Sequence, residues 1–257
     1  MTESDIRKCL DTNLFGKIIH CFDVLDSTNT YTKKLALQGA EEGTVVLAEE
    51  QISGRGRFER KWISSGGKNL TFSVIVRPNI SPQRIGILSL YAALAVTKGI
   101  LELLEQPPTC KWPNDVLLNG KKVCGILSEA VFIDSSLSAV IIGIGLNVNQ
   151  TTFPPAIESS AISLAQVSGH DIDRSYVLAC VLGKLEELYR NIQEGRLRLI
   201  IDLWQQHSTL LGKKITVDQQ GNLLRGTAKA IDDDGGLILA VNGGERKVHA
   251  GDVTIVS

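Results

Sequence analysis

A long apolar segment at residues 85–104 is the feature that most constrains what this chain can fold into. Ser81 and Pro82 precede it in the order typical of a helix start, a capping residue followed by proline at the first helical position. The segment is apolar around most of its circumference, so a helix here must be covered on most sides, as it is when it packs on a sheet. Lys98 and Glu102 interrupt the apolar run and favour a buried helix over a membrane span.

Short β-branched or alternating segments on both sides of this helix predict the strands of that sheet. Between the first two, Ser27 and Thr28 are residues of the kind that cap helix N-termini, and helical spacing follows until Gly39. The segment at 70–76 alternates apolar with polar residues, which predicts a half-buried strand with one polar face. Asn119-Gly120 predicts a hairpin turn. The expected strands are residues 20–25, 44–48, 70–76, 109–112, 116–118, 123–127 and 137–146.

The C-terminal part of the chain has a different texture. Helices are expected at 161–167, 173–192 and 197–204. From Leu211 onward, short strand candidates alternate with glycine-containing turns, a pattern typical of a small β-barrel. We therefore predict an α+β main domain at 1–208 and a β-barrel domain at 209–257. The strand candidates of the barrel are residues 215–217, 223–230, 237–241, 245–250 and 253–256.

Charge and cysteine content narrow the classes of function. The formal net charge of −1 over 257 residues argues against a general nucleic-acid binder, which usually carries a basic domain. The five cysteines include no C-x-x-C pair, so they favour neither a disulfide framework nor a zinc site and suit a reducing cytosol. The N-terminus lacks the apolar core of a signal peptide. We expect a cytoplasmic protein without nucleic-acid or membrane partners.

The most distinctive local feature is the stretch Gly54-Arg55-Gly56-Arg57-Phe58-Glu59-Arg60-Lys61-Trp62, which has four cations and two glycines between two predicted strands. Glycine lets backbone approach a ligand closely, and the planar fork of arginine fits phosphate or carboxylate. Taken alone, such a stretch is more typical of a solvated basic turn. Two further segments, 111–115 and 143–149, also follow or end predicted strands, where site residues are often held. Because a half-buried Lys111 beside an arginine loop is unfavourable without an anion, the three segments together predict a phosphate or carboxylate ligand.

Five motifs occur in order along the chain: Asp26-Ser27-Thr28-Asn29, the 54–62 stretch, Lys111-Trp112-Pro113-Asn114-Asp115, Gly125-Ile126-Leu127 and Gly143-Ile144-Gly145-Leu146-Asn147-Val148-Asn149. In identity, order and spacing they resemble the motifs of the biotin–protein ligases, also called biotin–[acetyl-CoA-carboxylase] ligases. The resemblance runs from about residue 20 to the end of the chain. It implies a mixed β-sheet catalytic domain flanked by helices, of the class II aminoacyl-tRNA synthetase-like biotin–lipoate ligase fold, followed by an SH3-like β-barrel.

The resemblance also implies a two-step reaction that uses ATP and Mg²⁺, with the ion entering on the ATP phosphates. Biotin is first activated to biotinyl-5′-AMP. The biotinyl group then passes to a lysine of the biotin carboxyl carrier protein or domain of a biotin-dependent carboxylase. A homodimer formed through the exposed edge of the main sheet is compatible with this resemblance.

Site residues follow from the motif positions. Lys111 and Arg55 match catalytic positions, and Lys111 is expected to aim positive charge at the reacting phosphorus. Ser27 and Thr28 can cap a helix as well as bind biotin, and Asn147 and Asp115 can equally be turn-forming residues. The implied biotin-binding residues are Ser27, Thr28, Asn29, Gln51, Arg55, Gly56, Arg57, Trp62, Lys111, Gly125 and Leu127. The implied adenylate-binding residues are Arg55, Arg57, Lys111, Asp115 and Asn147.

Two departures from the family pattern and two alternatives remain. Glu59 stands where many members carry glycine, and we expect it to stiffen the loop or to pair with Arg60. About 20 residues precede the first predicted strand, too few for the helix-turn-helix of the family's repressors, so we expect a ligase without DNA binding. A lipoate–protein ligase is the nearest alternative enzyme, and the 54–62 and 111–115 segments favour biotin over it. A nucleic-acid-binding module that uses the arginine loop is the alternative from another class, and the net charge disfavours it.

Overall fold

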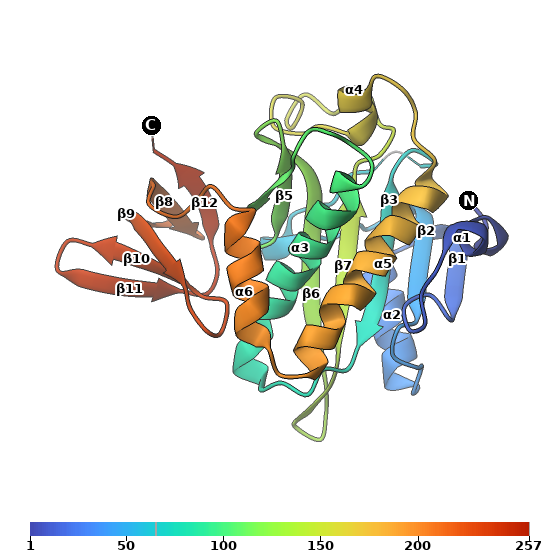
Figure 1. Ribbon diagram of the computed structural model, residues 1–257, viewed down its shortest axis with the longest axis horizontal. Helices are drawn as coiled ribbons and strands as arrows, with labels where there is room; N and C mark the ends of the chain where they lie inside the picture. The colour runs from blue at the N-terminus through green and yellow to red at the C-terminus, as the bar shows by residue number, and fades with distance from the viewer. Residues whose placement is uncertain (65, 257) are drawn as a thin grey trace.

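The computed structural model describes residues 1–64 and 66–256 and is dominated by a seven-stranded mixed sheet (Figure 1). The strand order is β1-β2-β3-β7-β6-β5-β4, in which β1 and β2 are parallel and every other neighbouring pair is antiparallel. The sheet confirms the predicted mixed α+β fold. Its strands are β1 (Ile19–Leu25), β2 (Val45–Gln51), β3 (Leu70–Val76), β4 (Thr109–Lys111), β5 (Asp115–Leu118), β6 (Lys121–Ile133) and β7 (Ser136–Leu146).

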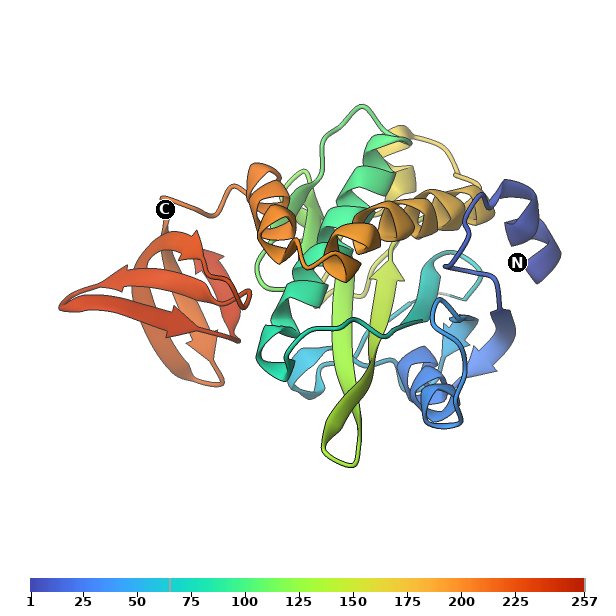
Figure 2. The same ribbon diagram turned by 60° about the horizontal axis from the view of Figure 1, so that its bottom comes forward.

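Helices cover both faces of this sheet. On one face α3 contacts the strands and is itself packed against α5 and α6, whereas α2 lies on the opposite face over β3, β6 and β7 (Figures 1 and 2). Two predicted caps are confirmed: Ser27 Oγ accepts the N–H of Thr30 at the start of α2, and Asp173 accepts the N–H of Ser175 at the start of α5. The predicted start at Ser81-Pro82 is wrong, because the Ser81 side chain makes no capping hydrogen bond and the long apolar helix begins at Gly86. The helices are α1 (Glu3–Cys9), α2 (Thr28–Leu37), α3 (Gly86–Leu101), α4 (Leu164–Ser168), α5 (Arg174–Gln193) and α6 (Leu197–Gln206), with 3₁₀ turns η1 (Arg57–Glu59) and η2 (Pro82–Arg84).

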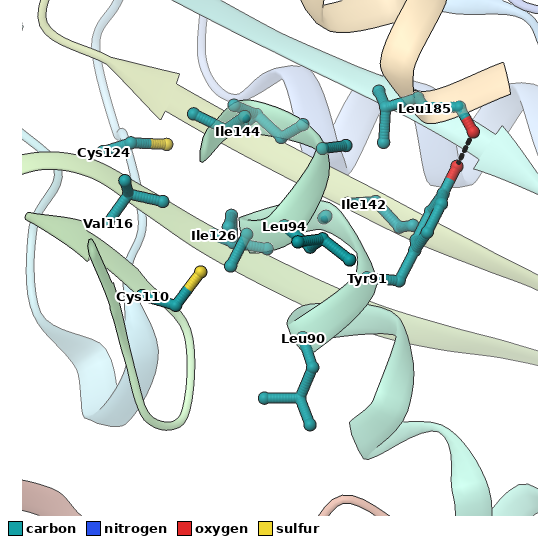
Figure 3. Packing of buried hydrophobic residues seen from close by; sticks show 14 of the residues in the cluster. Leu90, Tyr91, Leu94, Cys110, Val116, Cys124, Ile126, Ile142, Ile144 and Leu185 are labelled. Atoms are coloured by element: carbon teal, nitrogen blue, oxygen red, sulfur yellow. Dashed lines mark hydrogen bonds between the residues drawn. The ribbon is translucent and has the colours of Figure 1, made fainter. Parts of the chain in front are cut away.

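The apolar segment that opened the sequence analysis forms α3, the central helix of the core. Twelve of its 16 residues are buried, as an all-round apolar helix requires. Figure 3 shows Leu94 beside Ile126 of β6 and Ile142 of β7, and the Tyr91 hydroxyl donates to the Leu185 carbonyl at 2.7 Å. The 20 residues Pro82–Leu101 are long and apolar enough to cross a membrane, and 67% of the most apolar window is buried inside the protein.

The sheet separates apolar from polar residues face by face. On β3, β6 and β7, alternate residues such as Ile126 and Ile144 point toward α3 (Figure 3). By register, Thr71, Ser73 and glycines occupy the other face. The prediction that β3 is only half-buried is wrong, because all seven of its residues are buried. The reason is position: β3 lies between β2 and β7, and α2 covers its polar face.

The C-terminal strands form a second, five-stranded antiparallel sheet in the order β11-β10-β9-β8-β12 (Figure 2). All five lie where the sequence predicts strands. One of its contacts with the rest of the chain is the Trp112 indole N–H, which donates at 3.0 Å to the carbonyl of Gly235, in the turn between β9 and β10. Closure into an SH3-like barrel and the boundary at residue 208 stay predictions. The strands are β8 (Lys214–Gln219), β9 (Asn222–Ile231), β10 (Leu237–Val241), β11 (Gly244–Val248) and β12 (Asp252–Ile255).

Candidate active site

A cavity of about 280 Å³ lies on the polar face of the main sheet, on the side of α2. Its walls come from the N-terminal end of α2, the 54–62 loop, strands β5, β6 and β7, and Asp252 of the C-terminal sheet. All the residues predicted for the site line this cavity, with the exception of Lys111. Segments that are far apart in the sequence therefore meet at one place, as a single ligand site formed by the motifs requires.

Glycines on neighbouring strands create the floor of the cavity. Gly125 of β6 and Gly145 of β7 are register partners in the antiparallel ladder, so their missing side chains leave one continuous flat area. The Trp62 ring lies on this area, because a Cβ atom on Gly145 would come within 2.2 Å of its Cε2 atom. The indole N–H of Trp62 is buried and has no hydrogen-bond partner among the described residues. Here glycine is required for close approach rather than for an unusual backbone angle.

A polar network forms the end of the cavity beneath α2. The backbone N–H and the hydroxyl of Thr28 lie 2.7 and 3.0 Å from the Oε1 atom of Gln51 and donate to it. Ser73 Oγ lies 2.8 Å from Thr28 Oγ1 and 2.6 Å from Asn29 Oδ1. Ser27 both caps α2 and lines the cavity, so the predicted capping role is confirmed and the predicted contact with biotin stays a prediction. These buried groups form the closed polar surface expected around a small polar ring.

The 54–62 stretch folds as a narrow loop closed by its own backbone. The Trp62 N–H donates to the Gly54 carbonyl at 3.0 Å, and the Gly56 N–H donates to the Arg60 carbonyl at 2.6 Å. A Cβ atom on Gly54 would lie 2.5 Å from the Trp62 carbonyl oxygen, which explains glycine at that position. Phe58 at the tip has a positive φ of 53°. The side chain of Glu59 lies outside the described residues, so its predicted effect stays a prediction.

Three cations at the site have a carboxylate partner. Arg55 pairs with Glu129 at 3.1 Å, and Lys122 pairs with Asp115 at 2.6 Å. The third pair joins the loop to the C-terminal sheet, where Arg60 contacts Asp252.

Arg57 differs from these three cations. Its guanidinium donates to two neutral acceptors, Asn114 Oδ1 at 3.2 Å and the Gly251 carbonyl at 3.4 Å. Burial lowers the pKa of Arg57, and the charges of Asp252 and Asp115 oppose that shift. No carboxylate of the described residues is in ion-pair contact with this partly desolvated cation. A bound anion would therefore stabilise the charge of Arg57 more than the charges of the three paired cations.

The expected placement of Lys111 in the cavity is wrong, and Lys122 takes that place. β4 is the outermost strand, so Lys111 lies one strand beyond its register partner Asp115, which does line the cavity. Lys122 lines the cavity, and its Nζ atom is 5.8 Å from the centroid of the Trp62 ring.

Sequence reasoning missed Lys122 because of a β-bulge. The β5–β6 ladder pairs Asp115 with Gly125 and Leu117 with Lys122, so one additional residue is accommodated on β6. The bulge places Lys122 on the same face as Gly125, although simple alternation over three residues would place them on opposite faces. Asn114 and Asp252 were also missed, and Asp252 joins the site only through packing of the two sheets.

Comparisons with known proteins agree with this site. Residues 21–147 match the model of the Biotin/lipoate A/B protein ligase family, and residues 210–256 match that of the Biotin protein ligase C terminal domain. The chain is 38% identical over 257 residues to the Bifunctional ligase/repressor BirA of Bacillus subtilis (strain 168), covering 99% of this chain and 79% of that protein. It is 36% identical over 233 residues to the Biotin--[acetyl-CoA-carboxylase] ligase of Mycobacterium tuberculosis, covering 88% and 85% of the two chains.

A solved structure shares the same fold. The biotin protein ligase from Aquifex aeolicus in complex with biotin and ATP superimposes with a TM-score of 0.80 at 29% identity, covering 93% of this chain and 99% of that one. The chain therefore belongs to the biotin protein ligase family.

Proposed function

We propose that this chain is an ATP-dependent, AMP-forming biotin–[biotin carboxyl-carrier protein] ligase. In the first step, a carboxylate oxygen of biotin attacks the α-phosphorus of ATP, and pyrophosphate leaves, giving biotinyl-5′-AMP. In the second step, a lysine amine of the carrier attacks the acyl carbon, an amide bond forms, and AMP leaves with the electrons of the broken C–O bond. The observation that carries the proposal is one cavity with a glycine and tryptophan floor, a buried polar end and a desolvated arginine.

The polar end beneath α2 suits the ureido ring of biotin. Both Thr28 donors point to Gln51 Oε1, which fixes the Gln51 amide so that its Nε2 is available to a ligand carbonyl. Trp62, lying over Gly125 and Gly145, offers an aromatic face to the apolar bicyclic ring. Its buried indole N–H gains an acceptor when a ligand oxygen is bound nearby.

The cationic end suits the reacting anions. Arg57 and Lys122 would face the biotin carboxylate and the α-phosphate. Asp115 would hold the Lys122 ammonium in place until a substrate anion replaces Asp115 as its partner. A hydrogen bond to a charged group contributes about 1.5–3 kcal/mol. Two such bonds that strengthen in the transition state would change the rate by roughly 10²- to 10⁴-fold. We assign to Lys122 the role that the family resemblance implied for Lys111.

Mg²⁺ is proposed to enter with the phosphates of ATP, where it would neutralise charge on the leaving pyrophosphate. Residues 1–64 and 66–256 contain no group of three His, Cys, Asp or Glu side chains placed to hold a metal ion. Among the carboxylates at the cavity, Asp115 and Asp252 are the ones that line it and could contact such an ion.

Biotin-dependent pyrophosphate exchange tests the first step. Labelled pyrophosphate should enter ATP when biotin and Mg²⁺ are present, and replacing biotin by lipoate should reduce the exchange at least a hundredfold. Exchange with lipoate that equals or exceeds exchange with biotin would instead assign the chain to the lipoate branch of the matched family. A protein that exchanges with neither substrate would contradict the proposal as a whole.

We also propose that residues 1–257 act in the cytoplasm, form a homodimer, and do not bind operator DNA. The support is the presence of five unpaired cysteines, the outer edge of β1, and the net charge of −1, which disfavours nucleic-acid binding. Light scattering would test the dimer. A salt-sensitive, sequence-specific complex in a mobility-shift assay would contradict the absence of DNA binding.

A further inference from the structure

Glu129 is a carboxylate of the main sheet that the reaction described above does not use. It lies on β6 two residues beyond Leu127, on the same face of the sheet as the cavity. Its Oε2 atom accepts hydrogen bonds from Asn29 Nδ2 at 2.6 Å and from Arg55 Nη2 at 3.1 Å. One carboxylate thus joins α2 to the start of the 54–62 loop.

Asn29 is held firmly in this arrangement. Its Oδ1 atom lies 2.6 Å from Ser73 Oγ, and its Nδ2 atom also donates to the Leu127 carbonyl at 3.2 Å. A Cβ atom on Gly143 would lie 2.1 Å from Asn29 Oδ1, so the glycine lets the amide lie flat against β7. The carboxylate of Glu129 therefore rests on a fixed donor that belongs to the buried network.

The network runs without a break from the proposed ureido site to the loop. Gln51 contacts Thr28, Thr28 and Asn29 both contact Ser73, and Asn29 contacts Glu129. Arg55, the last member, is the second residue of the loop. A ligand that orders Thr28 and Gln51 therefore also orders the connected side chains that hold Arg55.

Arg55 lines the cavity, but its guanidinium is engaged by protein groups of fixed position, in contrast to that of Arg57. Its Nη2 atom donates to Thr30 Oγ1 at 3.1 Å as well as to Glu129. Neither of these two acceptors, Thr30 and Glu129, lines the cavity. The charge of Arg55 is thus balanced by protein, whereas Arg57 has neutral acceptors.

We propose that Glu129 is a positioning residue: by binding Arg55 and Asn29 together, it anchors the 54–62 loop over the cavity and couples loop closure to biotin binding. The inference rests on the proposed function. It assigns Arg55 to the anchor, so that the loop contacts the reacting anions through Arg57.

The test is a double-mutant cycle on Glu129→Ala and Arg55→Ala, with Glu129→Gln as the conservative variant. An ion pair of this exposure supports an effect of roughly fivefold. In each single variant, the KM for biotin and the rate of release of labelled biotinyl-5′-AMP should rise about fivefold. In Glu129→Ala, kcat of adenylation should stay within twofold of wild type. The double variant should be no worse than the single ones by more than twofold, and Glu129→Gln should lie between wild type and Glu129→Ala.

The control is Glu245→Gln, which removes a more exposed pair with Lys229 on the C-terminal sheet and should behave as wild type. Additive losses in the cycle, or a loss from Arg55→Ala that far exceeds the loss from Glu129→Ala, would show that Arg55 contacts substrate and would overturn the inference. Unchanged release of the adenylate by Glu129→Ala would overturn it as well.

Limited trypsin digestion gives a readout that does not depend on activity, because the loop contains four trypsin sites. Biotin should protect the loop of the wild-type protein, and Glu129→Ala should be cleaved there about fivefold faster with that protection reduced. Equal cleavage of the two proteins, at equal melting temperature, would refute the anchor. If wild type forms no biotinyl-5′-AMP, the proposed function fails. If wild type forms it and the variants match wild type, this inference alone fails.

Discussion

Replacing Gly145 by alanine tests the glycine floor of the cavity. Gly145 does not have a positive φ, so alanine fits the backbone, and the three atoms nearest to the added methyl group all belong to the Trp62 ring, at 2.2 to 2.6 Å. The indole must therefore move off the floor. If roughly 100 Å² of its apolar contact is lost, about half of what a buried tryptophan covers, the cost is about 2.5 kcal/mol at about 25 cal/mol per Å². We expect biotin binding by Gly145→Ala to be about 10- to 70-fold weaker than that of wild type.

Calorimetry with biotin measures this loss, and intrinsic fluorescence reports its cause. Trp112 and Trp204 are 1% and 0% exposed, so a change on adding biotin is dominated by Trp62. Gly183→Ala in α5 is the matched control, because its methyl group would meet no atom within 4 Å and should stabilise the helix by up to about 1 kcal/mol. Biotin binding by Gly145→Ala within twofold of wild type, with the same fluorescence change, would refute the role of the floor.

Three further predictions concern single side chains. Lys122→Ala should lower pyrophosphate exchange by about 10²-fold or more while biotin binding changes little, and Lys111→Ala should cost less than about tenfold; the opposite order would restore the assignment made from sequence. Arg57→Gly should let biotinyl-5′-AMP escape from the protein on a desalting column, and unchanged retention would contradict its role as the anion contact. Burial favours a raised pKa for Glu186, but the backbone N–H groups of residues 13–15 outweigh it and lower the pKa below 4.5. Because a lowered folded-state pKa contributes stability above the unfolded value that is lost as pH falls through the folded value, Glu186→Gln should lose about 1–3 kcal/mol at neutral pH. Denaturant titrations should show the gap from wild type narrowing below about pH 4.5, and a constant gap would contradict the assignment.

Local signals in the sequence predicted most of the secondary structure and much of the site. Ser27 and Asp173 cap helices because their side chains accept backbone N–H groups within a few residues. Asn119 and Gly120 both have positive φ, as their turn requires. Most of the motif residues meet in one cavity because they lie at or near the ends of elements that the local pattern predicts, whereas Gly125 and Leu127 reach it from within β6.

What the sequence could not predict depends on contacts between distant parts of the chain. The bulge in the β5–β6 ladder turns Lys122 into the cavity, and no local residue pattern marks that bulge. Asp252 reaches the site only because the C-terminal sheet packs beside the 54–62 loop. Thr71 and Ser73 resemble solvent-facing residues, yet they are buried because α2 covers them.

Mass spectrometry of a carrier domain tests the central claim most directly. The protein is incubated with biotin, Mg-ATP and a biotin carboxyl carrier domain, and the carrier is then weighed and mapped. The proposal predicts one added biotinyl group on a single lysine, dependent on ATP and lost when that lysine is replaced by arginine. A carrier that gains no mass while the protein is folded and saturated with biotin and ATP would contradict it.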